Sequence, residues 1–335
     1  MTTVCTKASF IALVVASAVV MLCYFTATFT QLSITSILHK EQHTTQSRQQ
    51  EFTEWTSTSA VDMPNVVVSA SLDYRNETFP CKRVVLMNMK FPICHYTPDI
   101  DETLSRFLLQ GRYFEENVVT RFLRLLLSDR RLQLVDIGAN VGIFSLPAAR
   151  VSNVLAIEPN KRSMYRLAKA VDLGAVSPNI TLVHNAVSNV RGTFKMGVYT
   201  FNQGNTFLIN TSKCIATPVN KPCNTLSPIR TIFLNDLLPL MRSRAALLKV
   251  DVEGHEVNVF TDLSAGKFFD EIDIPVVLME WLLCKRHSAN VVQRLLHFFY
   301  NRNYTAFDMH SVKLKTHYFK WPGSVVFKKT TNVGF

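Results

Sequence analysis

A glycine-rich and acidic segment near the middle of the chain carries the residue types needed to bind an adenosine cofactor. The apolar run 132–137 predicts a strand buried on both faces of a parallel sheet, and Asp136 lies near its end. Gly138 permits a tight turn after that strand, and Gly142 allows a helix to start close to it. Such a strand–turn–helix unit places a ligand in the crevice at the carboxyl end of the strand.

A second acidic residue, Glu158, follows Gly138 by twenty residues and ends the apolar run that starts at Val154. An acid at this position can accept hydrogen bonds from both hydroxyls of an adenosine ribose. A dinucleotide fingerprint needs glycines where this chain has Asn140 and Ile143, so NAD is disfavoured as the cofactor. An ordinary strand–helix turn with incidental glycines is the alternative interpretation.

A second chemically promising stretch, 246–256, carries charged residues in a strand-like alternation. Lys249, Asp251 and Glu253 would share one face of a strand, opposite buried valines. A central parallel strand should be apolar on both faces, so these charges need water, partners or a chemical role. A strand end closed by a salt bridge between Lys249 and Asp251 is the structural alternative.

The same stretch supplies the candidate catalytic groups. Asp251 is the first candidate to orient an acceptor hydroxyl or to help remove its proton. Glu253, predicted on the same face, and His255, just beyond it, are the further candidates. Glu256 would fall in the first turn of a following helix, where the helix dipole stabilises its charge.

The elements that must carry these residues can be located by apolar periodicity. Apolar spacing predicts helices within 111–127, at 161–173 and at 291–299. Apolar runs predict a strand with its exit over 180–188, and further strands at 274–281, 304–307 and 324–328. We interpret residues 192–232 as an insertion that shapes a substrate mouth, with a strand at 193–200. The expected architecture is α/β, with a mostly parallel sheet.

The exit of the predicted strand 180–188 should lie near the adenine of such a cofactor. Carboxyl ends of parallel strands meet at one edge of the sheet, where ligands bind. The Asn185 side chain or the backbone at Ala186 could therefore read the amino edge of adenine. A plain strand end is the alternative for each residue.

The N-terminal region predicts a membrane segment followed by a stem. No residue in 8–38 carries a formal charge, and a helix of about 20 residues spans roughly the 30 Å of a bilayer core. We expect a signal anchor with a cytoplasmic N-terminus, a cleaved signal peptide being the alternative. Residues 39–80 are rich in Thr, Ser and Gln and indicate a stem, which leaves 81–335 as a lumenal domain with its core at about 111–329.

Sequons and cysteines agree with a lumenal location. Four N-glycosylation sequons start at Asn76, Asn179, Asn210 and Asn303. Two cysteine pairs, Cys81 with Cys94 and Cys214 with Cys223, could each close a small disulfide loop, which leaves Cys284 over. The cysteine spacings match no zinc template, and no metal ligands are predicted.

The chain is basic, and the excess charge is concentrated at its C-terminal end. The formal net charge is +11, and residues 281–335 hold nine Lys or Arg against one acid, Asp308. Such a bias is commonly solvated surface, but it could also attract an acidic substrate or an anionic membrane face. Behind a membrane anchor, a nucleic-acid partner is not expected despite the pI of 9.4.

Taken in order, these motifs resemble those of the FkbM family of S-adenosylmethionine-dependent methyltransferases. The resemblance spans about 111–329 and rests on the segments Asp136–Gly142, Ile157–Pro159, Leu248–Glu256 and Val277–Glu280. It implies a Rossmann-like class I methyltransferase fold with helices on both faces of a mostly parallel sheet. It also implies S-adenosylmethionine as donor and methylation of a hydroxyl, often on a sugar or polyketide.

The resemblance assigns roles to particular residues of this chain. Asp136 would hold the methionine amino group and Glu158 the ribose, while Gly138, Asn140 and Gly142 would shape the loop around the donor. We therefore expect a membrane-anchored, single-pass type II methyltransferase of the Golgi or ER, acting on a hydroxyl of a glycan or small molecule. The alternatives are a protein of this fold that binds without catalysis, and methylation of a lipid or an amine.

Overall fold

The computed structural model describes one compact unit within Asp62–Phe335. The described residues are 66–68, 73–74, 76–199, 202–209, 215–216, 221–315 and 317–330. The predicted membrane segment 8–38, most of the stem, Asn210 and Cys214 lie outside them. Within the described ranges, no helix is long and apolar enough to span a bilayer.

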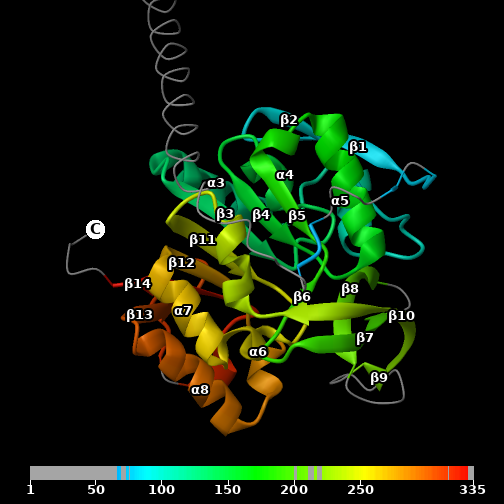
Figure 1. The fold of residues 1–335 in the computed structure, drawn as a ribbon. Coiled ribbons are helices and arrows are strands. Elements are labelled where there is room, and N and C mark those ends of the chain that lie inside the picture. The colour runs from blue at the N-terminus through cyan, green and yellow to red at the C-terminus, as the bar shows by residue number, and fades with distance from the viewer. Residues whose placement is uncertain are drawn as a thin grey trace, which may run out of the picture. The chain divides into compact units, whose positions relative to one another are not determined.

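A seven-stranded sheet forms the centre of this unit (Figure 1). Its strand order is β13-β14-β12-β11-β3-β4-β5. The bounds are β3 Leu132–Ile137, β4 Val154–Ile157, β5 Ile180–Val183, β11 Ala245–Val250, β12 Asp273–Glu280, β13 Tyr304–Phe307 and β14 Ser324–Lys329. The five strands from β12 to β5 are parallel, and β14 runs antiparallel to both of its neighbours. The mostly parallel sheet expected from the sequence is confirmed.

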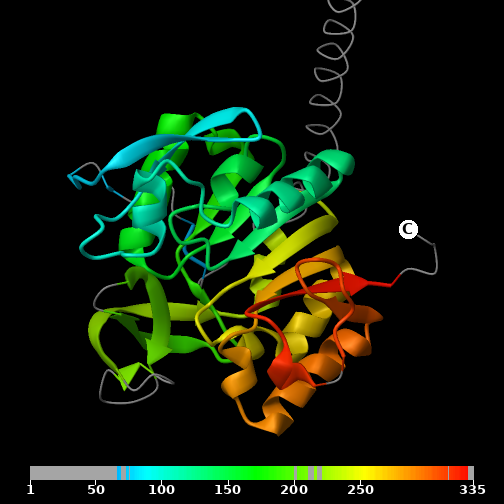
Figure 2. The same ribbon diagram turned by 180° about the vertical axis from the view of Figure 1, so that it is seen from behind.

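Helices cover both faces of the sheet in two groups (Figures 1 and 2). The chain moves outward from β3 through β4 to β5, and later outward from β11 through β12 in the opposite direction. Because crossovers between parallel strands are right-handed, the two series place their helices on opposite faces. The helices are α2 Leu104–Leu109, α3 Glu116–Ser128, α4 Ser145–Ala148, α5 Lys161–Gly174, α6 Glu256–Phe260, α7 Leu263–Glu271 and α8 Ala289–Tyr300. The helices predicted at 111–127, 161–173 and 291–299 correspond to α3, α5 and α8.

Two helix boundaries are close to the sequence-based expectation. The helix that Gly142 was expected to allow close to β3 begins at Ser145 and is four residues long. The helix predicted at 161–173 ends at Gly174, and the residue that follows, Ala175, is left-handed at φ +52°.

A second sheet lies beside the carboxyl ends of the main strands, at the lower right of Figure 1. Its order is β6-β10-β7-β8, with β9 paired to β10. The bounds are β6 Ala186–Val187, β7 Gly192–Tyr199, β8 Asn202–Ile209, β9 Ile215–Ala216 and β10 Lys221–Ile232. The sheet has a small apolar cluster of its own, formed by Ala186, Met196 and Ile229. It corresponds to the insertion expected at 192–232.

The strand and exit predicted over 180–188 correspond to β5 and to a segment that joins the second sheet. The strand β5 leaves the main sheet after Val183, and β6 pairs in parallel with β10 of the second sheet. Between them, the Nδ2 group of Asn185 donates to the Arg230 carbonyl, 3.2 Å away. This side-chain bond ties the chain to the second sheet, so the apolar run serves two sheets instead of one.

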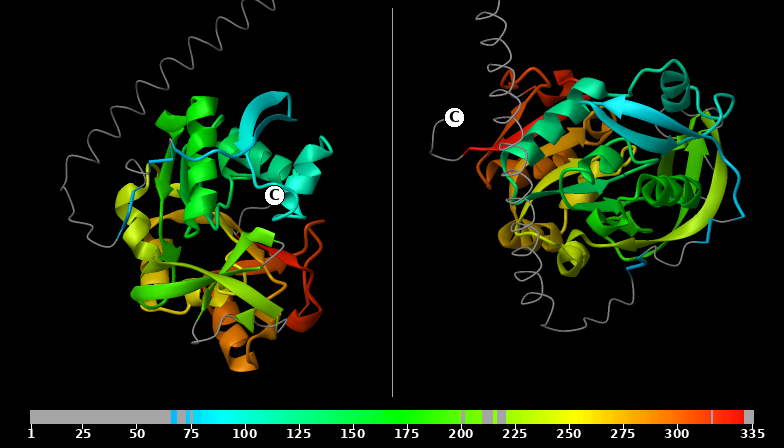
Figure 3. Two further views of the ribbon diagram at one scale, coloured as in Figure 1. Left: turned by 90° about the vertical axis from the view of Figure 1, so that its right-hand side faces the viewer. Right: turned by 90° about the horizontal axis from the view of Figure 1, so that it is seen from above.

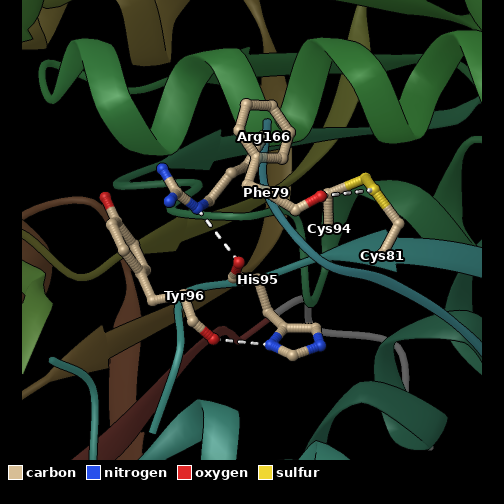
Figure 4. The surroundings of a disulfide bond; sticks show 6 residues. All are labelled: Phe79, Cys81, Cys94, His95, Tyr96 and Arg166. Carbon is tan, nitrogen blue, oxygen red and sulfur yellow. Dashed lines mark hydrogen bonds between the residues drawn. A yellow bond between two sulfur atoms is a disulfide. The ribbon is translucent and has the colours of Figure 1, made fainter. Parts of the chain in front are cut away.

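A disulfide-closed hairpin precedes the main domain. It consists of β1 Cys81–Leu86 and β2 Met89–Cys94, and β2 packs against α4 and α5 (Figures 1 and 3). Cys81 and Cys94 face each other in the antiparallel register and are bonded, as predicted (Figure 4). Among the described cysteines Cys284 is free, and it is buried.

Candidate functional site

A cavity of about 300 Å³ opens at the carboxyl ends of the central strands. It lies where the chain leaves β3 toward one side of the sheet and β11 toward the other, which is where doubly wound sheets bind ligands. Residues of the hairpin formed by β7 and β8 close its far wall, Phe207 and Asn205 among them. The volume is at the lower end of the range typical of small-molecule sites.

The turn after β3 can be formed only by glycine. Gly138 has φ +86°, and a Cβ atom there would lie 1.8 Å from the Asp251 carbonyl oxygen. Gly142 has φ +94°, and its Cβ would come within 2.5 Å of Leu167 and 2.8 Å of Leu146. Both glycines therefore allow close backbone packing, as the sequence predicted, but only Gly138 lines the cavity.

A buried ion pair joins the two central strands beneath this turn. The Nζ atom of Lys249 lies 3.3 Å from Asp136 Oδ1, and the two residues are register neighbours in β11 and β3. The same Nζ lies 3.4 Å from Asp251 Oδ2 and donates to the Gly138 carbonyl at 2.9 Å. Burial by itself would lower the pKa of Lys249, but the carboxylates of Asp136 and Asp251 raise it above its ordinary value. The ammonium is therefore permanently charged.

Asp136 does not lie where its expected role, contact with a methionine amino group, would place it. Its side chain is fully buried, and Oδ2 accepts a 2.7 Å hydrogen bond from Ser145. The residue does not line the cavity, because Lys249 stands between its carboxylate and the open space. In this structure Asp136 fixes Lys249 and Ser145, and its predicted contact with a methionine amino group remains a prediction.

Glu158 lines the cavity with its carboxylate held from two sides. Oε1 accepts from the Asn160 backbone N–H and Oε2 from that of Asn140, each at 2.7 Å. Burial raises the pKa of Glu158 to about 7, although the two backbone hydrogen bonds act in the opposite direction. Each oxygen keeps a lone pair, so the carboxylate can still accept from two vicinal hydroxyls. This geometry fits the ribose role predicted for Glu158.

The predicted strand alternation beyond Val250 is wrong, although the acids still reach the cavity. The strand β11 ends at Val250, and Glu253 adopts a left-handed turn conformation with φ +54°. Asp251 and Glu253 both line the cavity. Asp251 and Glu253 lie in the turn that includes Gly254, so the alternation of side chains along a strand does not apply to them. The salt bridge between Lys249 and Asp251, proposed as the structural alternative, is present.

Further carboxyl groups crowd this end of the cavity. Burial, followed by the charges of Asp251 and Glu253, raises the pKa of Glu280 to about 10, so Glu280 keeps its proton at neutral pH. Burial also raises the pKa of Glu256 to about 7. One oxygen each of Asp251, Glu256 and Glu280 lies within 4.8 Å of the others. Such a donor set could coordinate a hard cation, whereas the expectation of no metal ligands rested on zinc spacings alone.

His255 also lines the cavity but is a poor base. Burial, with the neighbouring His287, lowers the pKa of His255 to about 4. Its Nε2 atom lies 2.9 Å from the Ser188 hydroxyl. A neutral imidazole of this basicity accepts a proton only weakly at neutral pH.

Asn185 and Ala186 line the cavity as expected, but their polar groups already have protein partners. The Asn185 side chain accepts from the Val67 N–H at 2.8 Å and donates to Arg230. Ala186 is paired with Thr231 between β6 and β10. Adenine recognition by either residue therefore remains a prediction.

Three cavity features were missed by the sequence analysis. Glu115 lines the cavity from a left-handed position before α3, and burial raises its pKa. Asn160 supports Glu158 and caps α5, accepting from the Arg162 N–H. An Asn directly before a helix is a recognised capping signal and could have identified Asn160. The pairing of Lys249 with Asp136 joins distant segments and has no local signal.

Comparison with known proteins identifies the family of the chain. A family model described as the methyltransferase FkbM domain matches residues 136–305, half of the 335-residue chain. The chain is similar to a crystal structure of methyltransferase FkbM from Methylobacillus flagellatus KT, with 13% identity and a TM-score of 0.37. That match covers 59% of this chain but only 43% of the other, so the chain spans less than half of its length.

Two further solved structures are similar. A putative O-methyltransferase from Klebsiella pneumoniae has 15% identity and a TM-score of 0.37, over 71% of this chain and 92% of that one. A SAM-dependent O-methyltransferase from Thermotoga maritima has 8% identity and a TM-score of 0.34, over 76% and 79% of the two chains. No curated protein sequence matched the chain.

The glycine turn leads to a stability prediction. Gly138→Ala should lower the free energy of unfolding by at least about 2 kcal/mol, because both φ and the Asp251 carbonyl oppose a Cβ there. Gly323→Ala is the matched control, since Gly323 also lines the cavity and a Cβ there would meet nothing within 4 Å. Chemical denaturation of both variants gives the comparison. Equal stability of the two variants would contradict the assigned geometry.

Proposed function

Because the chain belongs to the FkbM methyltransferase family, we propose that it transfers the methyl group of S-adenosylmethionine to a hydroxyl of a glycan or small molecule. The observation that carries the proposal is the Glu158 carboxylate, held at the cavity by two backbone N–H groups beside the Gly138 turn. A carboxylate with free lone pairs in that place suits the two hydroxyls of a ribose.

The residues around the cavity fit this donor. S-Adenosylmethionine supplies an electrophilic methyl group on a positively charged sulfur. Glu158 would hold the ribose, and the backbone of the turn from Gly138 to Asn140 would lie against the donor. The carboxyl groups of Glu115, Asp251 and Glu253 line the cavity together with the Lys249 side chain. Burial raises the pKa of Glu253 well above its ordinary value, so its carboxyl group can keep a proton in the cavity.

The acceptor side needs one group to orient a hydroxyl and one to take its proton. Asp251 lines the cavity while Lys249 holds its carboxylate from behind, so the carboxylate can face the acceptor in a fixed orientation. Glu280 keeps its proton and can donate a hydrogen bond to an acceptor oxygen. The hairpin of β7 and β8 provides the wall against which the acceptor would rest.

We further propose that the 8–38 segment anchors the protein in a secretory-pathway membrane of the Golgi or ER, as a single-pass type II protein with a lumenal catalytic domain. The disulfide between Cys81 and Cys94 supports an oxidising compartment. Asn76 and Asn303 are exposed and accessible for glycosylation. Asn179 is also exposed, but its Nδ2 group donates to the Ala149 carbonyl.

Donor affinity should rise with pH through the pKa of Glu158. The ribose hydroxyls would donate hydrogen bonds to the Glu158 carboxylate. The protein with ionised Glu158 should therefore bind the donor more tightly than the protein with protonated Glu158. With a pKa of about 7, affinity for S-adenosylhomocysteine should increase about tenfold between pH 6 and pH 8. Calorimetry at both pH values measures this change, and Glu158→Gln should remove most of it. An equally steep dependence in the variant would assign the effect to another group.

Asp251→Asn tests the proposed proton acceptor. The change keeps the size of the side chain and removes its charge, so turnover should fall about 10²–10⁴-fold while donor affinity changes less. Asp236→Asn is the matched control, because Asp236 pairs with Arg191 at 2.6 Å outside the cavity. That variant should melt earlier with normal turnover. A folded Asp251→Asn protein with full turnover would exclude Asp251 from the chemistry.

Topology is tested with sealed microsomes. Protease added outside should spare the domain after the stem, and a peptide N-glycosidase applied after lysis should increase its gel mobility. Asn76→Gln with Asn303→Gln should reduce that mobility shift, because both side chains are exposed. Degradation of the domain in sealed vesicles would refute the lumenal assignment.

A further inference from the structure

The two backbone groups that hold Glu158 belong to residues whose own side chains are tied down. Asn140 and Asn160 each donate one N–H to the carboxylate. The Oδ1 atom of Asn140 accepts from the Ser163 hydroxyl at 3.2 Å. The Nδ2 group of Asn160 donates to Thr206 at 2.9 Å and lies 3.4 Å from the Tyr96 hydroxyl oxygen. The position of the carboxylate therefore depends on contacts beyond the cavity wall.

Both sets of contacts meet at Tyr96, which is not among the residues that line the cavity. Its hydroxyl lies 2.9 Å from Ser163 Oγ. Ser163 has one proton and gives it to Asn140, so Tyr96 must be the donor to Ser163. The bonds therefore run in one direction, from Tyr96 through Ser163 to Asn140. Asn160 Nδ2 has two hydrogens and lies closer to Thr206 Oγ1, at 2.9 Å, and to the Gln203 carbonyl, at 3.2 Å, than to the Tyr96 oxygen.

The surroundings of Tyr96 hold its ring in one place. Tyr96 is 1% exposed and follows the disulfide-closed hairpin by two residues. Figure 4 shows the Arg166 guanidinium beside the ring, 3.8 Å from its centroid, while Arg166 Nε donates to the His95 carbonyl. Burial raises the pKa of Tyr96 to about 12, so the hydroxyl keeps the proton that it donates.

The side-chain anchor of Asn140 supports a left-handed turn. Asn140 has φ +50°, a conformation that Asn adopts more readily than other non-glycine residues. Without a side-chain anchor, the peptide could relax and turn its N–H away from Glu158. The hydrogen bond from Ser163 holds the side chain, and through it the left-handed turn.

We propose that Tyr96 is a positioning residue for the donor site: its hydroxyl, through Ser163, holds Asn140 and thereby Glu158 in the arrangement that accepts the ribose. Tyr96 acts through these residues and does not touch the donor. The inference rests on the proposed donor, and it adds that the N-terminal hairpin, outside the family match at 136–305, belongs to the functional unit.

The test is the affinity for S-adenosylhomocysteine, measured by calorimetry on the purified full chain. Tyr96→Phe removes only the hydroxyl and should weaken binding about three- to tenfold, the size expected for one lost hydrogen bond. Turnover at saturating donor should stay within about twofold, so that the change appears in KM and not in kcat. Ser163→Ala breaks the next bond and should give a similar loss.

Tyr304→Phe is the matched control. Tyr304 is also buried, lies on the edge strand β13 and donates its hydroxyl to the Ile274 carbonyl of β12, and neither residue lines the cavity. Removing the Tyr304 hydroxyl should leave the affinity for S-adenosylhomocysteine unchanged, even if the substitution lowers the melting temperature. Equal affinity losses in Tyr96→Phe and Tyr304→Phe would show a general effect on folding and overturn the inference.

A double-mutant cycle separates positioning from stability. In a Glu158→Ala background there is no carboxylate to position, so Tyr96→Phe should cause no further loss of affinity. An additive loss in that background would overturn the inference, as would wild-type affinity in folded Tyr96→Phe and Ser163→Ala. If the wild type itself bound no S-adenosylhomocysteine, the proposed function would fail first.

Discussion

The site depends on a single buried cation. Lys249 lies between Asp136 and Asp251 and also donates to the Gly138 carbonyl, so one ammonium joins β3, β11 and the two turns that follow them. Breaking a buried ion pair by removing one partner typically costs about 3–5 kcal/mol, since an uncompensated charge is left behind. The two central strands are therefore fixed at their carboxyl ends, where the cavity requires a fixed wall.

The other walls of the cavity come from two segments outside the central strands. On one side, the hairpin closed by Cys81 and Cys94 brings Tyr96 to the helix that carries Ser163. On the other side, the second sheet folds over the cavity and places Phe207 against it. The end of the cavity proposed for the donor is thus built from the main sheet and the hairpin, and the end proposed for the acceptor is closed by the second sheet.

The features that could be predicted from the sequence are those that a local pattern determines. Gly138 and Glu158 were identified because a turn and a strand end impose their residue types, and the pair of Cys81 with Cys94 because its spacing suits a small loop. The end of β11, the burial of Asp136 behind Lys249 and the division of 180–188 between two sheets were not predicted. Each depends on contacts between segments far apart in sequence, for which periodicity gives no signal.

The separate apolar cluster of the second sheet has an evolutionary consequence. Ala186, Met196 and Ile229 pack with one another and do not belong to the main hydrophobic core. Substitutions in this sheet can therefore reshape this wall of the cavity without repacking the main core. Under the proposed function, a lineage that kept the ion pair at Lys249 and the carboxylate at Glu158 could diverge in acceptor preference through this one sheet, with the remainder of the domain conserved.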